Sequence, residues 1–63
     1  MDNEALNMSL RRFLKQLGVT SQQEIEKAVR RSARTSGRVP IVATVKSEAL
    51  GLEHVVKGEI DLG

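Results

Sequence analysis

The chain has 63 residues, of which 40% are apolar and 29% charged, with a formal net charge of +2 and no cysteine. A domain of this length buries only about 60% of the surface of its unfolded chain, so it lies near the lower limit for independent folding. No disulfide can reinforce it, and its single histidine excludes a structural zinc site with about four nitrogen or sulfur ligands. We therefore expect residues 1–63 to form one small α+β domain stabilised by apolar packing, and a homodimer is one route to further stability.

The N-terminal sequence MDNEALNMSL contains acidic residues and lacks the basic region that opens a secretory signal. No apolar run reaches the roughly 18 residues needed to cross a bilayer. The composition is that of an ordinary folded domain and not of a disordered chain. We therefore expect a cytoplasmic protein that does not use a membrane.

An amphipathic helix is predicted over residues 3–17. Its apolar side chains recur at helical spacing and form one stripe, made of Leu6, Leu10, Phe13, Leu14 and Leu17. Basic residues such as Arg11 and Arg12 point the other way, and Met8 lies off the stripe. Gly18 follows the last stripe residue and suits the left-handed position just after a helix. The first helix is therefore predicted to end there.

A second helix is predicted to begin at Thr20 or Ser21. Ser21 and Glu24 match a capping box, in which each of the two side chains accepts a hydrogen bond from a free backbone N–H at the start of the helix. The inner face of this helix is expected to consist of Ile25, Ala28, Val29, Ser32 and Ala33. Gly37 is the expected C-terminal cap. Because the connection over residues 18–20 is short, the two helices should be packed neighbours.

From about residue 39 the apolar period changes to two, which predicts a β-hairpin with its loop within residues 47–51. Pro40 lies at the start of the first strand, where a missing N–H is tolerated. Gly58 interrupts the second strand, as at a β-bulge. The face-sharing residues are Ile41, Ala43 and Val45 in the first strand and Leu52, His54, Val56, Ile60 and Leu62 in the second. A hairpin alone is marginally stable, so we expect an ααββ fold with both helices on its apolar face.

Candidate catalytic residues are few. His54 is the only imidazole, and strand parity turns it toward the helices, which favours a partly buried structural histidine over a catalytic one. Glu59 and Asp61 project to one face, where paired carboxylates can transfer protons or hold a hard cation. Their alternation with Ile60 and Leu62 is equally typical of a half-exposed strand. We therefore predict that the protein is not an enzyme and has no cofactor or metal site.

The basic segment, residues 27–38, carries five cations and no acid: Lys27, Arg30, Arg31, Arg34 and Arg38. On a helix, the first four lie opposite the inner face, as on any amphipathic surface helix. The same geometry suits contact with phosphate, for which the arginine fork is well shaped. Because no acid follows Glu26 there, few neutralising i,i+4 pairs are expected. Two interpretations of the basic segment remain open. It is a nucleic-acid or anion-binding surface, or it is a solvated helix face whose cations interact favourably with the helix dipole.

Residues 13–31 followed by a hairpin are similar to the second half of a winged helix, but a helix-turn-helix needs a third, supporting helix. The only aromatic residue, Phe13, belongs to the stripe, so no base-stacking platform is available. We therefore favour a non-enzymatic binding module that acts by protein–protein contact or self-association. Its contacts would be the open hairpin edges or exposed apolar residues such as Met8 and Val55. Duplex or backbone binding through the arginine face is the alternative function.

The segments LNMSLRRFLKQLGVTSQQEIEKAV and GLEHVVKGEIDL resemble a family of very short bacterial proteins classed as a domain of unknown function. The resemblance covers most of the chain except residues 33–44. It implies a complete, free-standing bacterial cytoplasmic protein. It supplies no activity, partner or site residue.

Overall fold

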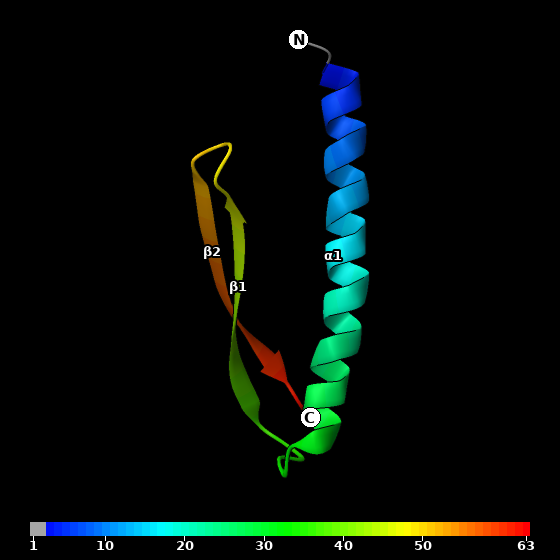
Figure 1. Cartoon of the computed structure of the whole chain (residues 1–63). Coiled ribbons are helices and arrows are strands. Elements are labelled where there is room, and N and C mark those ends of the chain that lie inside the picture. The colour runs from blue at the N-terminus through cyan, green and yellow to red at the C-terminus, as the bar shows by residue number, and fades with distance from the viewer. Residues whose placement is uncertain (1–2) are drawn as a thin grey trace. The chain divides into compact units, whose positions relative to one another are not determined.

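The computed structural model describes residues 3–63 and contains one helix and two strands, namely α1 (Asn3–Arg31), β1 (Arg38–Ser47) and β2 (Leu52–Asp61) (Figure 1). The predicted α+β class is confirmed, whereas the prediction of two helices is wrong. The chain divides into a helical unit that ends at Ala33 and a hairpin unit, Arg34–Gly63. The expected packing of helix on hairpin, and the expectation of one domain, stay predictions.

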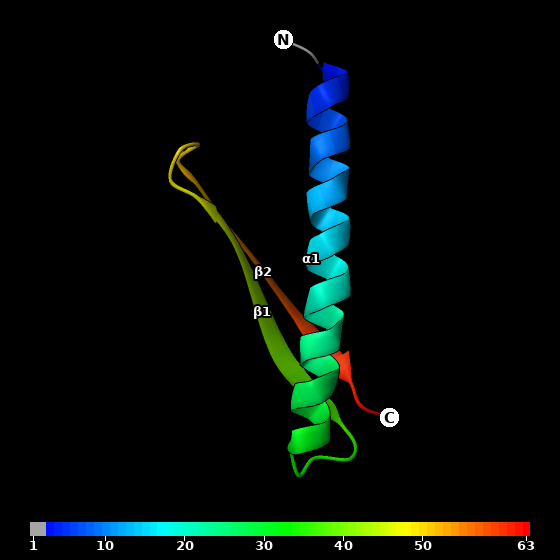
Figure 2. The same cartoon turned by 45° about the vertical axis from the view of Figure 1, so that its right-hand side comes forward.

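The helix α1 continues through the segment that the sequence assigned to a loop, and its ribbon shows no break there (Figure 2). Gly18 does not have the positive φ of a left-handed residue. Thr20 Oγ1 donates a hydrogen bond of 2.9 Å to the carbonyl oxygen of Gln16, one turn earlier, as mid-helix threonines do. Glu24 contacts Lys27 Nζ at 3.1 Å, toward the C-terminal side of the helix. Neither Thr20 nor Glu24 therefore behaves as a helix-capping residue.

Continuity of the apolar stripe explains why the helix does not stop. Ser21 and Ile25 follow Leu17 at successive intervals of four residues, so the same side of the helix persists past Gly18. A glycine in the interior of a helix lowers the stability of the helix by about 1 kcal/mol relative to alanine. A break would instead leave about four carbonyl and four N–H groups without helical partners. The smaller cost favours the single helix.

The helix ends at Arg31, before the predicted cap. The backbone N–H of Ser32 donates to the carbonyl oxygens of Ala28 and Val29 at 3.0 and 3.1 Å, and its Oγ donates to that of Val29 at 3.0 Å. Gly37 does have a positive φ of 90°. However, its carbonyl oxygen accepts a 2.8 Å bond from Leu62 N–H. Gly37 therefore opens the hairpin and does not cap the helix.

β1 and β2 pair in an antiparallel register that runs without interruption from Arg38↔Asp61 to Ser47↔Leu52. The predicted bulge at Gly58 is therefore wrong, because this residue pairs regularly with Ile41. The register places the predicted face-sharing residues within the two strands on one face, the apolar face, which Val39 also joins: Ile41, Ala43, Val45, Leu52, His54, Val56 and Ile60. The other, charged face carries Arg38, Pro40, Val42, Thr44, Lys46, Glu53, Val55, Lys57, Glu59 and Asp61.

The hairpin loop spans residues 48–51, within the predicted range. Gly51 has a φ of 61°, and its N–H donates to the carbonyl oxygen of Glu48 at 3.2 Å. Leu50 N–H donates to Ser47 Oγ at 3.4 Å. This left-handed residue brings the chain back into β2, so glycine is required here for conformational reasons.

Alanine at the two hairpin glycines is expected to have unequal effects. Gly51→Ala should lower the free energy of unfolding by about 1 kcal/mol, because an L side chain disfavours positive φ. Gly58→Ala should leave it unchanged or raise it by up to about 1 kcal/mol, since the new Cβ meets only Ile41 Cγ2, at 4.0 Å. Urea denaturation measures both. A loss at Gly58 as large as that at Gly51 would contradict the regular register.

Candidate binding surfaces

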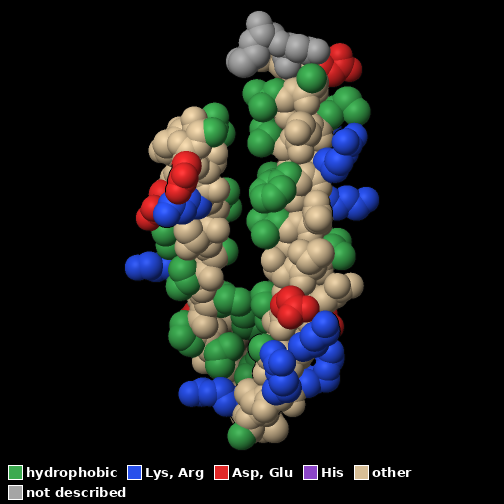
Figure 3. All heavy atoms as spheres, in the orientation of Figure 1, with side chains coloured by type: hydrophobic (Ala, Val, Ile, Leu, Met, Phe, Trp, Pro, Cys, Tyr) green, Lys and Arg blue, Asp and Glu red, His purple; other side chains and the backbone are tan. Residues whose placement is uncertain are grey.

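The apolar stripe of α1 is the main exposed apolar surface of the helical unit. Figure 3 shows hydrophobic side chains gathered along one side of the helix. Leu10, Phe13 and Leu14 are 48%, 52% and 54% exposed. Over residues 3–63 no side chain is buried. Because the helical unit has no second element, its stripe can be covered only from outside that unit.

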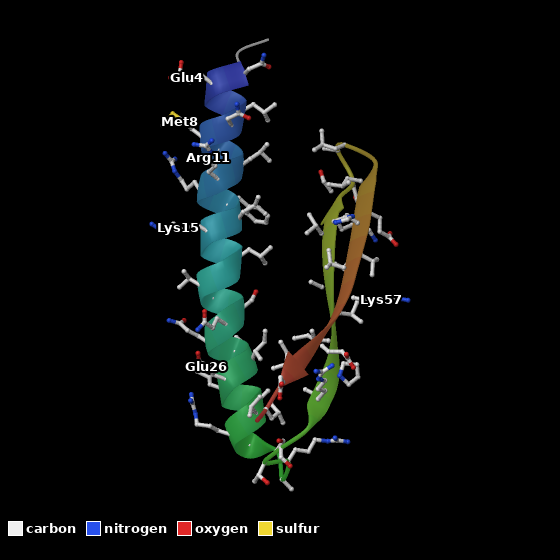
Figure 4. The ribbon with its side chains drawn as sticks, turned by 180° about the vertical axis from the view of Figure 1, so that it is seen from behind. Glu4, Met8, Arg11, Lys15, Glu26 and Lys57 are labelled. Atoms are coloured by element: carbon white, nitrogen blue, oxygen red, sulfur yellow. The ribbon has the colours of Figure 1, made fainter. Side chains whose placement is uncertain are left out.

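The opposite side of α1 is polar. Glu4, Met8, Arg11, Lys15 and Glu26 all project from this side (Figure 4). Met8 is 58% exposed, which agrees with its predicted position off the stripe. The continuous helix thus has one apolar side and one mainly polar side, on which Met8 and Val19 are exposed apolar residues.

The predicted basic segment does not form one helix face. Lys27, Arg30 and Arg31 lie in the last turns of α1, where cations stabilise the helix through its dipole. Arg34 lies in the connection after the helix, and Arg38 begins β1. The sequence placed the first four on one helix because it extended that helix too far.

Lys27, Arg30 and Arg38 each form an ion pair, and only the pair of Arg30 has the i,i+4 spacing that was expected to be scarce. Lys27 Nζ lies 3.1 Å from Glu24 Oε2 and Arg30 Nη1 lies 4.0 Å from Glu26 Oε2, both within α1. Across the hairpin, Arg38 Nη1 lies 3.9 Å from Glu59 Oε1. The partners are all well exposed, so each pair stabilises the fold by only about 0.2–1 kcal/mol. They nevertheless reduce the positive charge available to an anion.

Nucleic-acid binding through this segment stays a prediction. Its resemblance to a helix-turn-helix is wrong, because residues 13–31 contain no turn and are helical throughout. Lysine and arginine side chains are visible at two levels of α1, near its first third and near its C-terminal end (Figure 3). The lower group is the one in which Glu24 and Glu26 form ion pairs.

His54, Glu59 and Asp61 do not converge. His54 lies on the apolar face opposite Val45, as strand parity predicted, but its side chain is exposed and not partly buried. Glu59 and Asp61 lie on the charged face, where the first pairs with Arg38. Asp61 Oδ1 accepts a 2.9 Å bond from Gly63 N–H. Residues 3–63 contain no group of three or more potential metal ligands.

The two edges of the sheet differ in their backbone groups. The bond from Leu62 N–H to Gly37 fixes the phase of the ladder, so even-numbered β1 residues and odd-numbered β2 residues point their N–H and C=O groups outward. Pro40 is one of these outward residues, and it has no N–H. The outer edge of β2 contains no proline. The open edges and the place of Pro40 follow from the sequence, whereas the hydrogen-bonding phase follows only from the register.

A family model described as "Family of unknown function (DUF6494)" matches residues 1–63. The chain belongs to this family. The predicted resemblance to an uncharacterised family is thereby confirmed over the whole chain. Membership assigns no activity, so the roles of individual residues depend on the geometry described above.

Beyond the family model, no curated protein and no solved structure matches the chain. Within residues 3–63, α1 is long enough to span a bilayer but too polar, and no other helix is present. The edge of β2, the stripe of α1 and the apolar face of the hairpin are therefore the surfaces from which a function for this family member can be argued.

Proposed function

We propose that the protein is a non-enzymatic binding module that acts by protein–protein contact, with a second copy of the same chain as its partner. The observation that carries the proposal is the stripe of α1, in which Leu10, Phe13 and Leu14 are about half exposed. A side chain of this kind contributes about 1.5–3 kcal/mol when it is moved from water into an apolar contact. An assembly that covers the stripe would recover that free energy.

The hairpin supports the same proposal. Two strands alone are marginally stable, and they need further strands or packing against a helix to become independently stable. One chain supplies two strands, whereas two chains supply four strands and two helices. Self-association therefore provides a larger sheet than one short chain can form by itself.

The placement of the titratable side chains supports a non-enzymatic role. Acid–base catalysis needs groups within hydrogen-bond reach of one reacting centre. His54 lies on one face of the hairpin, whereas Glu59 and Asp61 lie on the other. Within a sheet, side chains on opposite faces cannot act on the same atom.

Self-association is expected to make stability depend on protein concentration. Thermal unfolding of the wild-type chain should show a Tm that rises from low micromolar to millimolar concentration, because only the folded state associates. Sedimentation velocity over the same range should show a monomer converting to a dimer. A monomer at all concentrations, with a constant Tm, would refute the proposal.

A further inference from the structure

We propose that two copies of the chain join through the outer edges of β2 to form one four-stranded antiparallel sheet with Val55 on the two-fold axis. This inference rests on the proposed self-association and names the surface and register by which it occurs. It uses backbone groups that point away from β1, at Glu53, Val55 and Lys57. Edge pairing of this kind is the usual way in which an open strand binds another chain.

The choice of β2 follows from Pro40. Because Pro40 is an outward-pointing residue of β1, that edge lacks one of its N–H donors. A second strand added to β1 would leave its own carbonyl group opposite a proline ring. The β2 edge offers an N–H at every outward position from Glu53 to Asp61. Pairing at β2 alone also produces a closed dimer, and Pro40 disfavours further growth at the β1 edges, which lie at the two ends of the sheet.

The charges of β2 select the register. With Val55 on the axis, Glu53 of each copy lies opposite Lys57 of the other, which gives two pairs of opposite charge. Neither Glu53 nor Lys57 forms an ion pair within residues 3–63. Lys57 projects outward from the hairpin (Figure 4). The two residues are therefore available to a second copy.

Neighbouring registers are worse. An axis at Val56 puts Glu53 opposite Glu59, and an axis at Lys57 puts two lysines together and Glu53 opposite Asp61. An axis at Gly58 pairs Lys57 with Glu59, but that carboxylate already contacts Arg38, and Val55 would face Asp61. Only the register with its axis at Val55 combines two new charge pairs with an apolar contact at the centre.

The joined sheet would also enlarge the apolar face. A two-fold axis perpendicular to the sheet keeps the apolar faces of both hairpins on the same side. This larger apolar face still needs a covering layer, because a sheet buries its apolar side against another element.

Proline scanning tests the edge. Val55→Pro should weaken self-association at least about tenfold, because it removes the two central bonds between copies and none within the hairpin. Val42→Pro is the matched control, since Val42 is also an outward-pointing valine, on β1, and is similarly exposed, 58% against 46%. It should leave association unchanged. Sedimentation velocity measures both, and equal effects would overturn the inference.

Charge reversal tests the register. Glu53→Lys and Lys57→Glu each place like charges opposite one another in a homodimer, so each variant alone should associate about tenfold more weakly. Mixed together, they restore both opposite-charge pairs, and a heterodimer should form. If the wild type dimerises and the mixture does not recover, this register is wrong.

Amide hydrogen exchange of the wild-type chain tests pairing at the β2 edge separately from self-association as such. At dimer-forming concentration the amides of Glu53, Val55 and Lys57 should become protected, whereas those of Glu59 and Asp61 should still exchange quickly. A dimer in which all five exchange quickly would overturn the β2 edge and leave self-association standing. A monomer at millimolar concentration would overturn both.

Discussion

Substitutions of Gly18 are expected to change stability in opposite directions. Gly18→Ala should raise the free energy of unfolding by about 0.5–1 kcal/mol, because alanine is the better helix former and a Cβ there meets no atom within 4 Å. Gly18→Pro should lower it by about 3 kcal/mol or more, since proline removes a helical N–H and collides with the preceding turn. Urea denaturation followed by far-ultraviolet circular dichroism measures both changes.

The sign of the alanine effect distinguishes one helix from two. If Gly18 were a left-handed residue between two helices, alanine would destabilise the protein by about 1 kcal/mol. Gly51→Ala provides that reference within the same chain, because Gly51 has a φ of 61°. Matching losses at both positions would contradict the continuous α1, whereas a gain at Gly18 with a loss at Gly51 is the expected result.

Gly18 also shows what local sequence signals cannot decide. A glycine after an apolar stripe, followed by Thr20 and Ser21, has the composition of a helix end and a new helix start. The same residues fit a helix interior at a modest cost. The outcome depends on the stripe that continues to Ile25, which is a property of the longer segment. The period predicted the helical region correctly, and the local signals predicted a false boundary within it.

The strands were easier to predict because period two assigns every side chain to a face once the strand is recognised. The shared face of Val45 and His54 follows from parity and is confirmed by the register. The ion pairs formed by the basic residues were harder to predict. Glu59 meets Arg38 only because the hairpin register brings them together, and the sequence alone does not supply that register. Glu24 and Glu26 precede their partners, so counting acids within the basic segment missed them.

Truncation of Phe13 is expected to have the largest effect on the assembled protein. Phe13→Ala should lower the free energy of unfolding by about 3–5 kcal/mol at concentrations where the chain self-associates, because the ring is then covered by apolar contacts. Met8→Ala should change it by no more than about 0.5 kcal/mol. The two side chains are a matched pair, since they are 52% and 58% exposed and lie on opposite sides of α1. Thermal and urea unfolding at fixed concentration compare the variants with the wild type.

Dilution then identifies what covers the ring. If the cover is a second copy, the cost of Phe13→Ala should shrink as the wild type is diluted toward the monomer, because the wild type loses the same contacts. If the chain's own hairpin covers the stripe, the cost should be the same at every concentration. A constant loss would therefore preserve the sequence-based expectation of helix on hairpin and contradict self-association through the stripe. A loss that disappears on dilution, with Met8→Ala silent throughout, would place the function of α1 at the contact between copies.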